Sequence, residues 1–205
     1  MSHGANPGMV NHFVKHALVT MAKDEWGAYP VPQNREQWAQ LAHKLDVQLI
    51  QISERDTQVS NMRRKPGEFA CTWCCSAMQD ESSEPSQVPL GTHENHTKPI
   101  SNRPDASVRL DARAPPTWYS GNFAGNNMVR SWNPVTGPFL GSLTPHDETF
   151  SISKYLEVPG HYRPTMFFCY SPAEDAIISL RDWFARYPQE PDSNRLMLQD
   201  IVSGA

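Results

Sequence analysis

Apolar residues recur at steps of three and four near the start of the chain, which is the spacing of one face of an amphipathic helix. The residues on this face are Met9, Val10, Phe13, Val14, Ala17, Leu18 and Met21. The pattern predicts a helix that begins at Met9 and ends near Lys23.

A second helical pattern follows after a proline-containing link. It buries Trp38, Leu41, Ala42 and Leu45, and Asn34 precedes it as an N-cap. The next segment, 47–52, is partly alternating and rich in β-branched residues, so it predicts a strand. The chain therefore begins in the order helix, helix, strand.

Short strand patterns and turn residues dominate the rest of the chain. Aromatic and small apolar residues at 67–77 predict a buried strand, and further strands are expected at 107–110, 128–132, 139–143 and 165–170. A strong helix begins near Ser171 or Pro172, with Ala176, Ile177, Leu180, Trp183 and Phe184 on one face. Segment 194–202 is weakly helical. Helices beside strands without regular alternation predict an α+β domain over residues 1–205.

One long segment carries almost no periodicity. Residues 78–104 are polar and rich in proline and serine, and the polar character continues to 116. We expect long loops over 78–116, and loops of this length are functional or disordered.

The composition of the chain argues against several classes of function. The chain has 205 residues with 18 Lys+Arg against 22 Asp+Glu, so it offers no basic surface for nucleic acid. No run approaches the roughly 20 apolar residues of a membrane span, and the N-terminus lacks signal-peptide features, so a cytoplasmic protein is expected. The sequence contains no G-x-G-x-x-G, the glycine-rich turn that cradles a dinucleotide.

The cysteines raise the question of a metal or a disulfide. Without a signal peptide, Cys71, Cys74, Cys75 and Cys169 are expected to be reduced thiols. The pairs Cys71-x2-Cys74 and His93-x2-His96 superficially match a zinc site. A strand would point the two cysteines to opposite faces, and the histidine pair lacks the usual spacer. Buried thiols and no metal are expected, and zinc remains an alternative.

Carboxylates beside an aromatic residue form the first candidate site. Glu54 and Asp56 end one predicted strand, Trp73 lies in the next, and Asp80 and Glu81 follow it. Carboxylates bind ammonium groups, and the face of an indole attracts a desolvated cation. The cluster suits a diamine or polyamine. The alternative is a solvated strand end beside a core tryptophan.

The second candidate site is the segment 144–148. His146 titrates in a range that suits proton transfer, and Glu148 is placed to orient it or to bind a substrate amine. The alternative is that these are simply polar residues that open a helical turn.

Taken together and in order, these segments resemble bacterial-type homospermidine synthase over nearly the whole chain. The matching segments are Gly4-Ala5-Asn6-Pro7-Gly8-Met9-Val10, residues 48–58, Thr72-Trp73, Gly91-Thr92-His93-Glu94, residues 129–132, His146-Asp147-Glu148, Tyr162-Arg163-Pro164-Thr165 and Ser171-Pro172. Members of that family convert two putrescines to homospermidine with release of ammonia, and NAD acts as their hydride shuttle. The resemblance implies the α+β catalytic domain of a saccharopine dehydrogenase-like architecture, with a mixed β-sheet flanked by helices.

The resemblance also implies roles for individual residues. Trp73, His146 and Glu148 match catalytic positions, and Trp73 would hold the cationic intermediate by cation–π attraction. Glu54, Glu81, Asn6 and His93 match substrate-binding positions. Asn6 also matches the asparagine that meets the nicotinamide of NAD.

The sequence departs from the family in one important respect. Family members carry a glycine-rich Rossmann domain ahead of the Asn-Pro-Gly motif, whereas Asn6 stands almost at the start of this chain. We therefore expect a domain truncated at both ends, a homodimer, and NAD supplied by a Rossmann-domain partner chain. The competing hypothesis is a non-catalytic fragment that keeps a polyamine-binding or dimerisation role.

Overall fold

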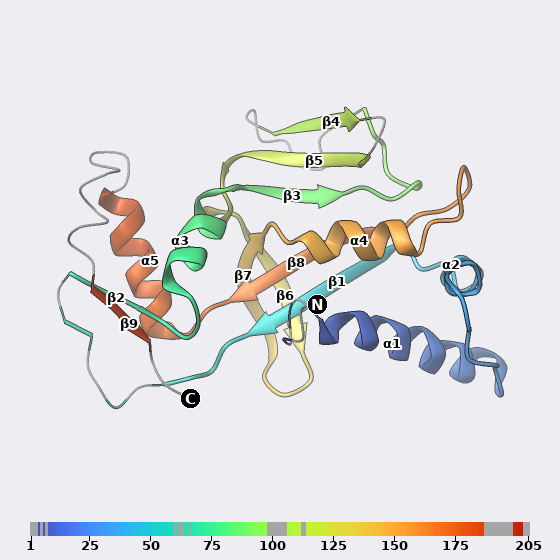
Figure 1. Ribbon diagram of the computed structural model, residues 1–205, viewed down its shortest axis with the longest axis horizontal. Helices are drawn as coiled ribbons and strands as arrows, with labels where there is room; N and C mark the ends of the chain where they lie inside the picture. Colours follow the sequence, from blue (N-terminus) through green and yellow to red (C-terminus); the bar gives the residue numbers. More distant parts are fainter. Residues whose placement is uncertain are drawn as a thin grey trace. The chain divides into compact units, whose positions relative to one another are not determined.

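The computed structural model describes residues 4, 6, 8–59, 61, 64–65, 67–97, 106–111, 114–186 and 199–202. Its elements in chain order are α1 (Met9–Trp26), α2 (Arg35–Lys44), β1 (Leu49–Arg55), β2 (Glu68–Cys71), α3 (Cys75–Ser83), β3 (Pro85–Pro89), β4 (Ser107–Asp111), β5 (Ala114–Phe123), the short 3₁₀ helix η1 (Ala124–Asn126), β6 (Met128–Asn133), β7 (Gly137–Thr144), α4 (Asp147–Tyr155), β8 (Thr165–Ser171), α5 (Glu174–Arg186) and β9 (Gln199–Val202) (Figure 1). The α+β class predicted from the sequence is confirmed.

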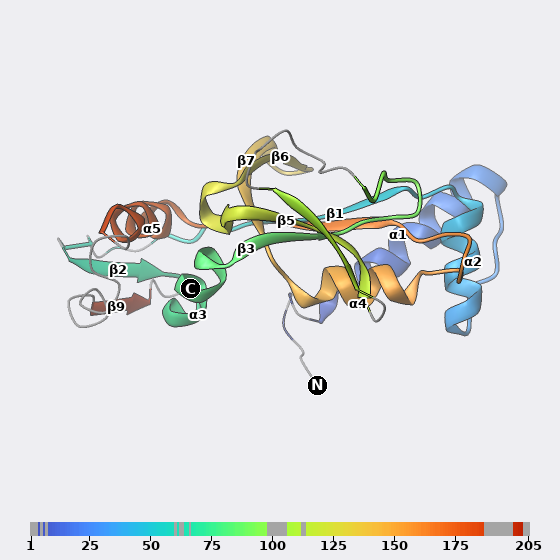
Figure 2. The same cartoon turned by 90° about the horizontal axis from the view of Figure 1, so that it is seen from above.

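The described strands form three sheets. One has the order β1-β8-β7-β6, the second pairs β2 with β9, and the third has the order β3-β5-β4. Strands β6 and β7 form an antiparallel hairpin, whose two arrows lie side by side in both ribbon views (Figures 1 and 2). Strands β1 and β8 point the same way in Figure 1, so the largest sheet is mixed, as expected.

The chain divides into two compact units, each built from three segments. The first unit takes residues 1–52, 87–121 and 145–168, and the second takes 53–86, 122–144 and 169–205. In the first unit α1 and α2 bury Leu18, Ala22 and Leu41, and α4 buries Ile152. In the second unit Phe69 of β2, Met78 of α3 and Trp183 of α5 are buried. Each unit therefore has an apolar core of its own.

The first two helices form where the sequence predicted them, although Met9, Phe13, Ala17 and Met21 of the predicted apolar face of α1 are exposed. Helix α1 runs to Trp26, slightly beyond the predicted end, and stops at Gly27, whose φ of 77° suits glycine and whose N–H donates to the Lys23 carbonyl oxygen at 2.8 Å. Asn34 is the N-cap of α2, because its side-chain oxygen accepts a hydrogen bond from the Gln37 N–H at 3.0 Å. The predicted α5 face is also confirmed, with Ala176, Leu180 and Trp183 buried.

The structure corrects three sequence-based expectations. Segment 67–77 is not one strand: β2 ends at Cys71 and α3 begins at Cys75, where Cys75 and Met78 are buried three residues apart, a helical spacing. Residues 78–89 are not a loop, because α3 continues to Ser83 and β3 follows with Ser86 and Val88 buried in alternation. Residues 199–202 form β9, a strand parallel to β2, instead of a helix.

Parts of two predictions fall outside the described residues. These parts are 98–105 and 112–113 of the expected loops, and 194–198 of the expected helical tail. Within the described part of the chain, no helix is both long enough and apolar enough to cross a membrane.

Candidate functional site

Trp73 is the centre of a cluster in the second unit. It lies in the bend at 72–74 between β2 and α3, and 36% of its surface is exposed. Its indole Nε1–H donates a hydrogen bond to the Tyr170 hydroxyl oxygen at 3.1 Å. Tyr170 lies on β8 and is only 7% exposed. The indole is thus held at one edge by a buried residue and remains accessible to solvent.

Two carboxylates from the end of β1 belong to the same cluster. Burial is the main reason that the pKa of Tyr170 rises to about 12, and the negative charges of Asp56 and Glu54 add to the rise. Hydrogen bonds from Trp73 and Thr72 act on this pKa in the opposite direction. Glu54 and Trp73, named separately from the sequence, therefore share Tyr170 as a neighbour.

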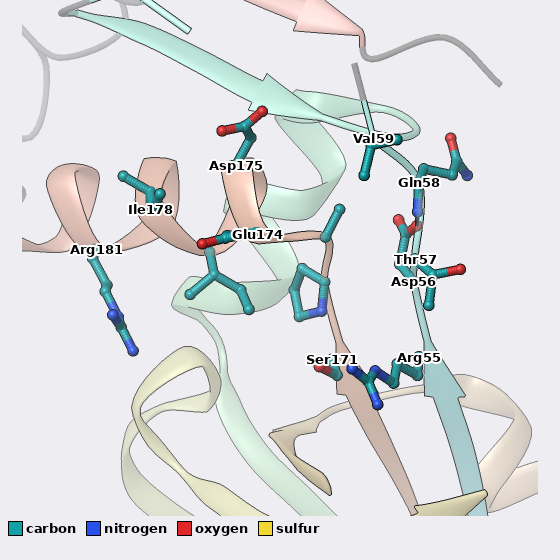
Figure 3. Close-up of a pocket in the computed structure, with 13 residues that line it drawn as sticks. Arg55, Asp56, Thr57, Gln58, Val59, Ser171, Glu174, Asp175, Ile178 and Arg181 are labelled. Atoms are coloured by element: carbon teal, nitrogen blue, oxygen red, sulfur yellow. Dashed lines mark hydrogen bonds between the residues drawn. The ribbon is translucent and has the colours of Figure 1, made fainter. Parts of the chain in front are cut away.

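A cavity of about 650 Å³ opens beside this cluster at the ends of β1 and β8 (Figure 3). Figure 3 shows segment 55–59 along one side and residues of α5 along the other. Arg55 and Arg181 contribute positive charges to its lining, whereas Asp56, Glu174 and Asp175 contribute negative charges. Asp56 lines this cavity and also receives a hydrogen bond from Thr72, so it links the cavity to the bend that carries Trp73.

Glu81 lies on α3, within the helix that follows Trp73, and is half-buried. From the sequence, Glu81 was expected just beyond the end of a strand, and the change from strand to helix at Cys75 accounts for the difference. Its part in substrate binding stays a prediction.

The second candidate site, in the first unit, is built around the Glu148 carboxylate. Helix α4 begins at Asp147, and Glu148 in its first turn is only 5% exposed. Its Oε1 accepts hydrogen bonds from the Gly8 N–H at 2.7 Å and from Asn11 Nδ2 at 3.3 Å. The N-terminal motif and the His146-Asp147-Glu148 segment, which the resemblance named separately, are thus in direct contact. Asn6 lies in a turn two residues before Gly8 and is half-buried.

His146 stands directly before α4, beside the same carboxylate. Its Nδ1 lies 3.4 Å from Glu148 Oε2, and its ring packs at 4.8 Å from that of Phe168. Among the described residues, neither this nitrogen nor this oxygen makes a hydrogen bond, although both are buried. Such a pair is suited to a ligand that both accepts and donates hydrogen bonds, because buried polar atoms are normally satisfied.

Burial lowers the pKa of His146 below its ordinary value of 6.5, and the charges of Glu148 and Asp147 partly offset this effect. Because the unfolded chain binds the proton more tightly, stability is expected to fall as pH drops below about 6.5 towards the folded-state pKa. Urea unfolding between pH 7 and pH 5 measures this, and His146→Gln should flatten the dependence. His12→Gln, at an exposed position of α1, is the control. Parallel curves for wild type and His146→Gln would contradict the prediction.

His93 lies at an exposed position of the loop after β3, in the first unit. Its Nε2 lies 3.2 Å from Glu94 Oε1, an oxygen that also accepts a hydrogen bond from Thr165 Oγ1 at 3.1 Å. The Gly91 N–H donates to the same threonine hydroxyl at 2.8 Å. The segments 91–94 and 162–165, which the resemblance singled out separately, are therefore hydrogen-bonded to each other. A role of His93 towards substrate stays a prediction.

The structure also corrects the expectation about the cysteines. Cys71 and Cys75 form a disulfide, because the bend at 72–74 brings their Cα atoms to 5.6 Å, within the range that such a bond spans. Cys74 is an exposed free thiol and Cys169 a buried one. The absence of signal-peptide features, on which the expectation of reduced thiols rested, carries no information about this local geometry. No group of three or more His, Cys, Asp or Glu side chains with the arrangement of a metal site occurs among the described residues.

Tyr170, Thr72 and Asn11 were missed as site residues by the sequence analysis. Tyr170 sits in an apolar strand, where an aromatic residue is indistinguishable from a core residue. Thr72 was noted only as part of the Thr72-Trp73 match, and Asn11 faces Glu148 across a contact that no local pattern signals.

Comparisons with known proteins show what the chain is similar to. A homospermidine synthase from Blastochloris viridis is 35% identical over 206 residues, which cover 98% of this chain and 42% of that protein. A homospermidine synthase from Mesorhizobium japonicum is 34% identical over 213 residues, with the same two coverages. The chain is similar to one part of these homospermidine synthases.

A solved structure agrees with these two homospermidine synthases. The crystal structure of the homospermidine synthase from Legionella pneumophila in complex with NAD matches with a TM-score of 0.81 and 34% identity, over 91% of this chain and 40% of that one. No family model matches the chain. The chain spans about two-fifths of the length of the homospermidine synthases it matches, so the resemblance predicted from the sequence is confirmed for that part of them.

Proposed function

We propose that this chain forms the amine-binding part of a homospermidine synthase-type reaction, in which two putrescines become homospermidine and ammonia. The observation that carries the proposal is the exposed Trp73 indole next to Tyr170, whose surroundings include Glu54 and Asp56. An indole face with carboxylates nearby is a binding site for an alkylammonium group, because both attract a cation.

The second unit suits the anchoring of a charged amine. Trp73 offers a partly desolvated aromatic surface, and Glu54 and Asp56 supply the counter-charges that keep an ammonium group protonated. Oxidation of a diamine at one end requires that its other end stay anchored. We assign this anchoring to Trp73 and Glu54, with Glu81 as a further carboxylate on the substrate path.

The first unit suits the handling of a proton on an amine. His146 favours its neutral form because burial lowers its pKa, so it can accept a proton from an ammonium group. Glu148 lies 3.4 Å away and stabilises the imidazolium that then forms. Asn6 and His93 complete the proposed set of amine-binding residues.

NAD supplies the hydride chemistry of this reaction class: when bound, it takes a hydride from the carbon that bears the amine and later returns it. The residues present do not fit a whole dinucleotide, because no G-x-G-x-x-G occurs in the sequence and no glycine-rich cradle occurs in the described part. Only Asn6 is proposed to touch the cofactor. We propose that a Rossmann-type domain holds it, on this protein or on a partner chain.

Isothermal titration calorimetry with putrescine tests the proposal. We expect saturable binding of putrescine, binding at least about tenfold weaker for 1-aminobutane because it lacks one ammonium group, and none for 1,4-butanediol. Failure to bind putrescine, or equal binding of the diol, would contradict the proposal. Binding without turnover, in the presence of NAD and a Rossmann-domain chain, would support the non-catalytic alternative.

A further inference from the structure

We propose that the cavity at the ends of β1 and β8 binds a basic α-amino acid, a class of ligand that the proposed function does not include. Two arginines and three carboxylates line this cavity, and all of its lining residues belong to the second unit. Its volume of about 650 Å³ is in the range of small-molecule sites. A cavity with charges of both signs suits a ligand that also carries both, because each charged group then meets an opposite charge.

The two arginines provide the binding site for the carboxylate of the ligand. Arg55 ends β1 and Arg181 lies on α5, so the two side chains reach the cavity from different sides (Figure 3). The Arg55 guanidinium lies over the Phe139 ring, 5.9 Å from its centroid. Among the described residues, neither arginine side chain has a hydrogen-bonded or ion-paired partner. Both guanidinium groups are therefore available to a carboxylate, which arginine binds through parallel hydrogen bonds.

The sequence of α5 explains why Arg181 is not neutralised within its own helix. Ion pairs in a helix form between residues three or four positions apart. The residues at these distances from Arg181 are apolar: Ile177, Ile178, Phe184 and Ala185. The adjacent carboxylate, that of Asp182, is instead paired with Arg64, whose Nη2 lies 2.7 Å from Asp182 Oδ2. The positive charge of Arg181 is thus left to face the cavity.

The carboxylates provide the binding sites for the ammonium groups of the ligand. Glu174 and Asp175 lie in the first turn of α5, and Asp56 directly follows β1. Asp56 accepts hydrogen bonds from Thr72 and from the Gln58 N–H. The side chains of Glu174 and Asp175 accept none from the part of the chain that the structure describes. These two carboxylates are therefore available to an ammonium group.

The balance of charges favours a basic amino acid over a neutral one. Two arginines against three carboxylates leave the lining with one net negative charge. A ligand with two ammonium groups and one carboxylate carries one net positive charge, and Pro172 and Ile178 in the lining can cover its methylene groups. Putrescine lacks the carboxylate, so it would leave both guanidinium groups without a counter-charge. Trp73 is not part of this lining, so the cavity and the proposed amine site are separate.

Isothermal titration calorimetry with L-ornithine tests the inference. We expect saturable binding to the wild-type chain. L-Norvaline keeps the α-amino acid part and lacks the terminal ammonium group, so it should bind at least about tenfold more weakly, the effect of one hydrogen bond between charged groups. Equal binding of the two amino acids, or no binding of L-ornithine, would overturn the inference without the need for any variant.

Arg55→Gln and Arg181→Gln test the carboxylate site. Each should raise the Kd for L-ornithine at least about tenfold, whereas the Kd for putrescine should not rise. Arg109→Gln is the matched control, because Arg109 is exposed on β4 in the first unit and also lies over an aromatic ring, 4.2 Å from the centroid of Tyr119. It should change neither Kd. L-Ornithine binding that neither variant in the cavity weakens would overturn the inference.

Trp73→Ala separates this cavity from the proposed amine site. The variant should leave the Kd for L-ornithine within about twofold of wild type, because the indole does not line the cavity. An equal loss of L-ornithine and putrescine binding would mean that L-ornithine binds only as a diamine, which would overturn the inference. If putrescine fails to bind while L-ornithine binding depends on Arg55 and Arg181, the proposed function fails and the inference stands.

Discussion

Trp73→Ala is expected to weaken putrescine binding about 30-fold. The substitution removes an indole that is 36% exposed and hydrogen-bonded to Tyr170, on which the charges of Glu54 and Asp56 act, and a desolvated cation–π contact is worth about 2 kcal/mol. The loss should appear in calorimetry as a higher Kd with an unchanged stoichiometry. The free energy of unfolding should change little, because the bend at 72–74 remains closed by the disulfide between Cys71 and Cys75.

Trp132→Ala is the matched control for this experiment. Trp132 is 58% exposed on β6, so its removal takes away an exposed indole that has no part in the proposed site. We expect its Kd for putrescine to stay within twofold of wild type. An equal loss of affinity in both variants, or no loss in Trp73→Ala, would show that Trp73 does not hold the amine.

Gly91→Ala is expected to lower the free energy of unfolding by about 3 kcal/mol, the upper end of the cost of overpacking a tight site. A Cβ on this residue would lie 2.6 Å from both the Arg163 carbonyl oxygen and the Thr165 nitrogen, and 2.8 Å from His93 Cε1. The first two are backbone atoms, so no side-chain rotation relieves the clash. Urea unfolding followed by circular dichroism measures the loss.

The control for Gly91→Ala is Gly160→Ala. A Cβ at Gly160 meets nothing within 4 Å, so only its φ of 74° is unfavourable, at a cost of about 1 kcal/mol. A Gly91→Ala variant no less stable than Gly160→Ala would mean that segments 91–94 and 162–165 pack less tightly than the structure indicates. The substitution should also move His93, because the new Cβ would lie 2.8 Å from His93 Cε1.

The sequence predicted those helices and strands whose formation depends on residues close together in the chain. Helix α2 carries an apolar face and the Asn34 cap within a few residues, and β6 and β7 form where strands were predicted at 128–132 and 139–143. In the hairpin, Asn133 Oδ1 accepts hydrogen bonds from the Val135 and Thr136 N–H groups. Such short-range contacts leave a clear pattern because both partners lie in one window of sequence.

The remaining features depend on contacts between residues distant in the chain. Strand β9 forms because β2 offers it a parallel partner, an interaction that overrides the weak helical pattern. The chemistry of an indole, a carboxylate or an imidazole can be recognised from the sequence alone. This was sufficient to name Trp73, Glu54, His146 and Glu148. Tyr170, the hydrogen-bond partner of Trp73, was not named, because in an apolar strand the sequence does not show which aromatic hydroxyl is hydrogen-bonded.

The contact between Gly8 and Glu148 has a consequence for the order of folding. The two residues are 140 positions apart, so their hydrogen bond closes a loop that includes most of the chain. Closing such a loop costs chain entropy before any contact within it is gained, and long-range contacts therefore form slowly. We expect α1 and α2 to form early and the His146–Glu148 pair to acquire its surroundings last. The candidate site around His146 and Glu148 would then form only after α4 has been synthesised.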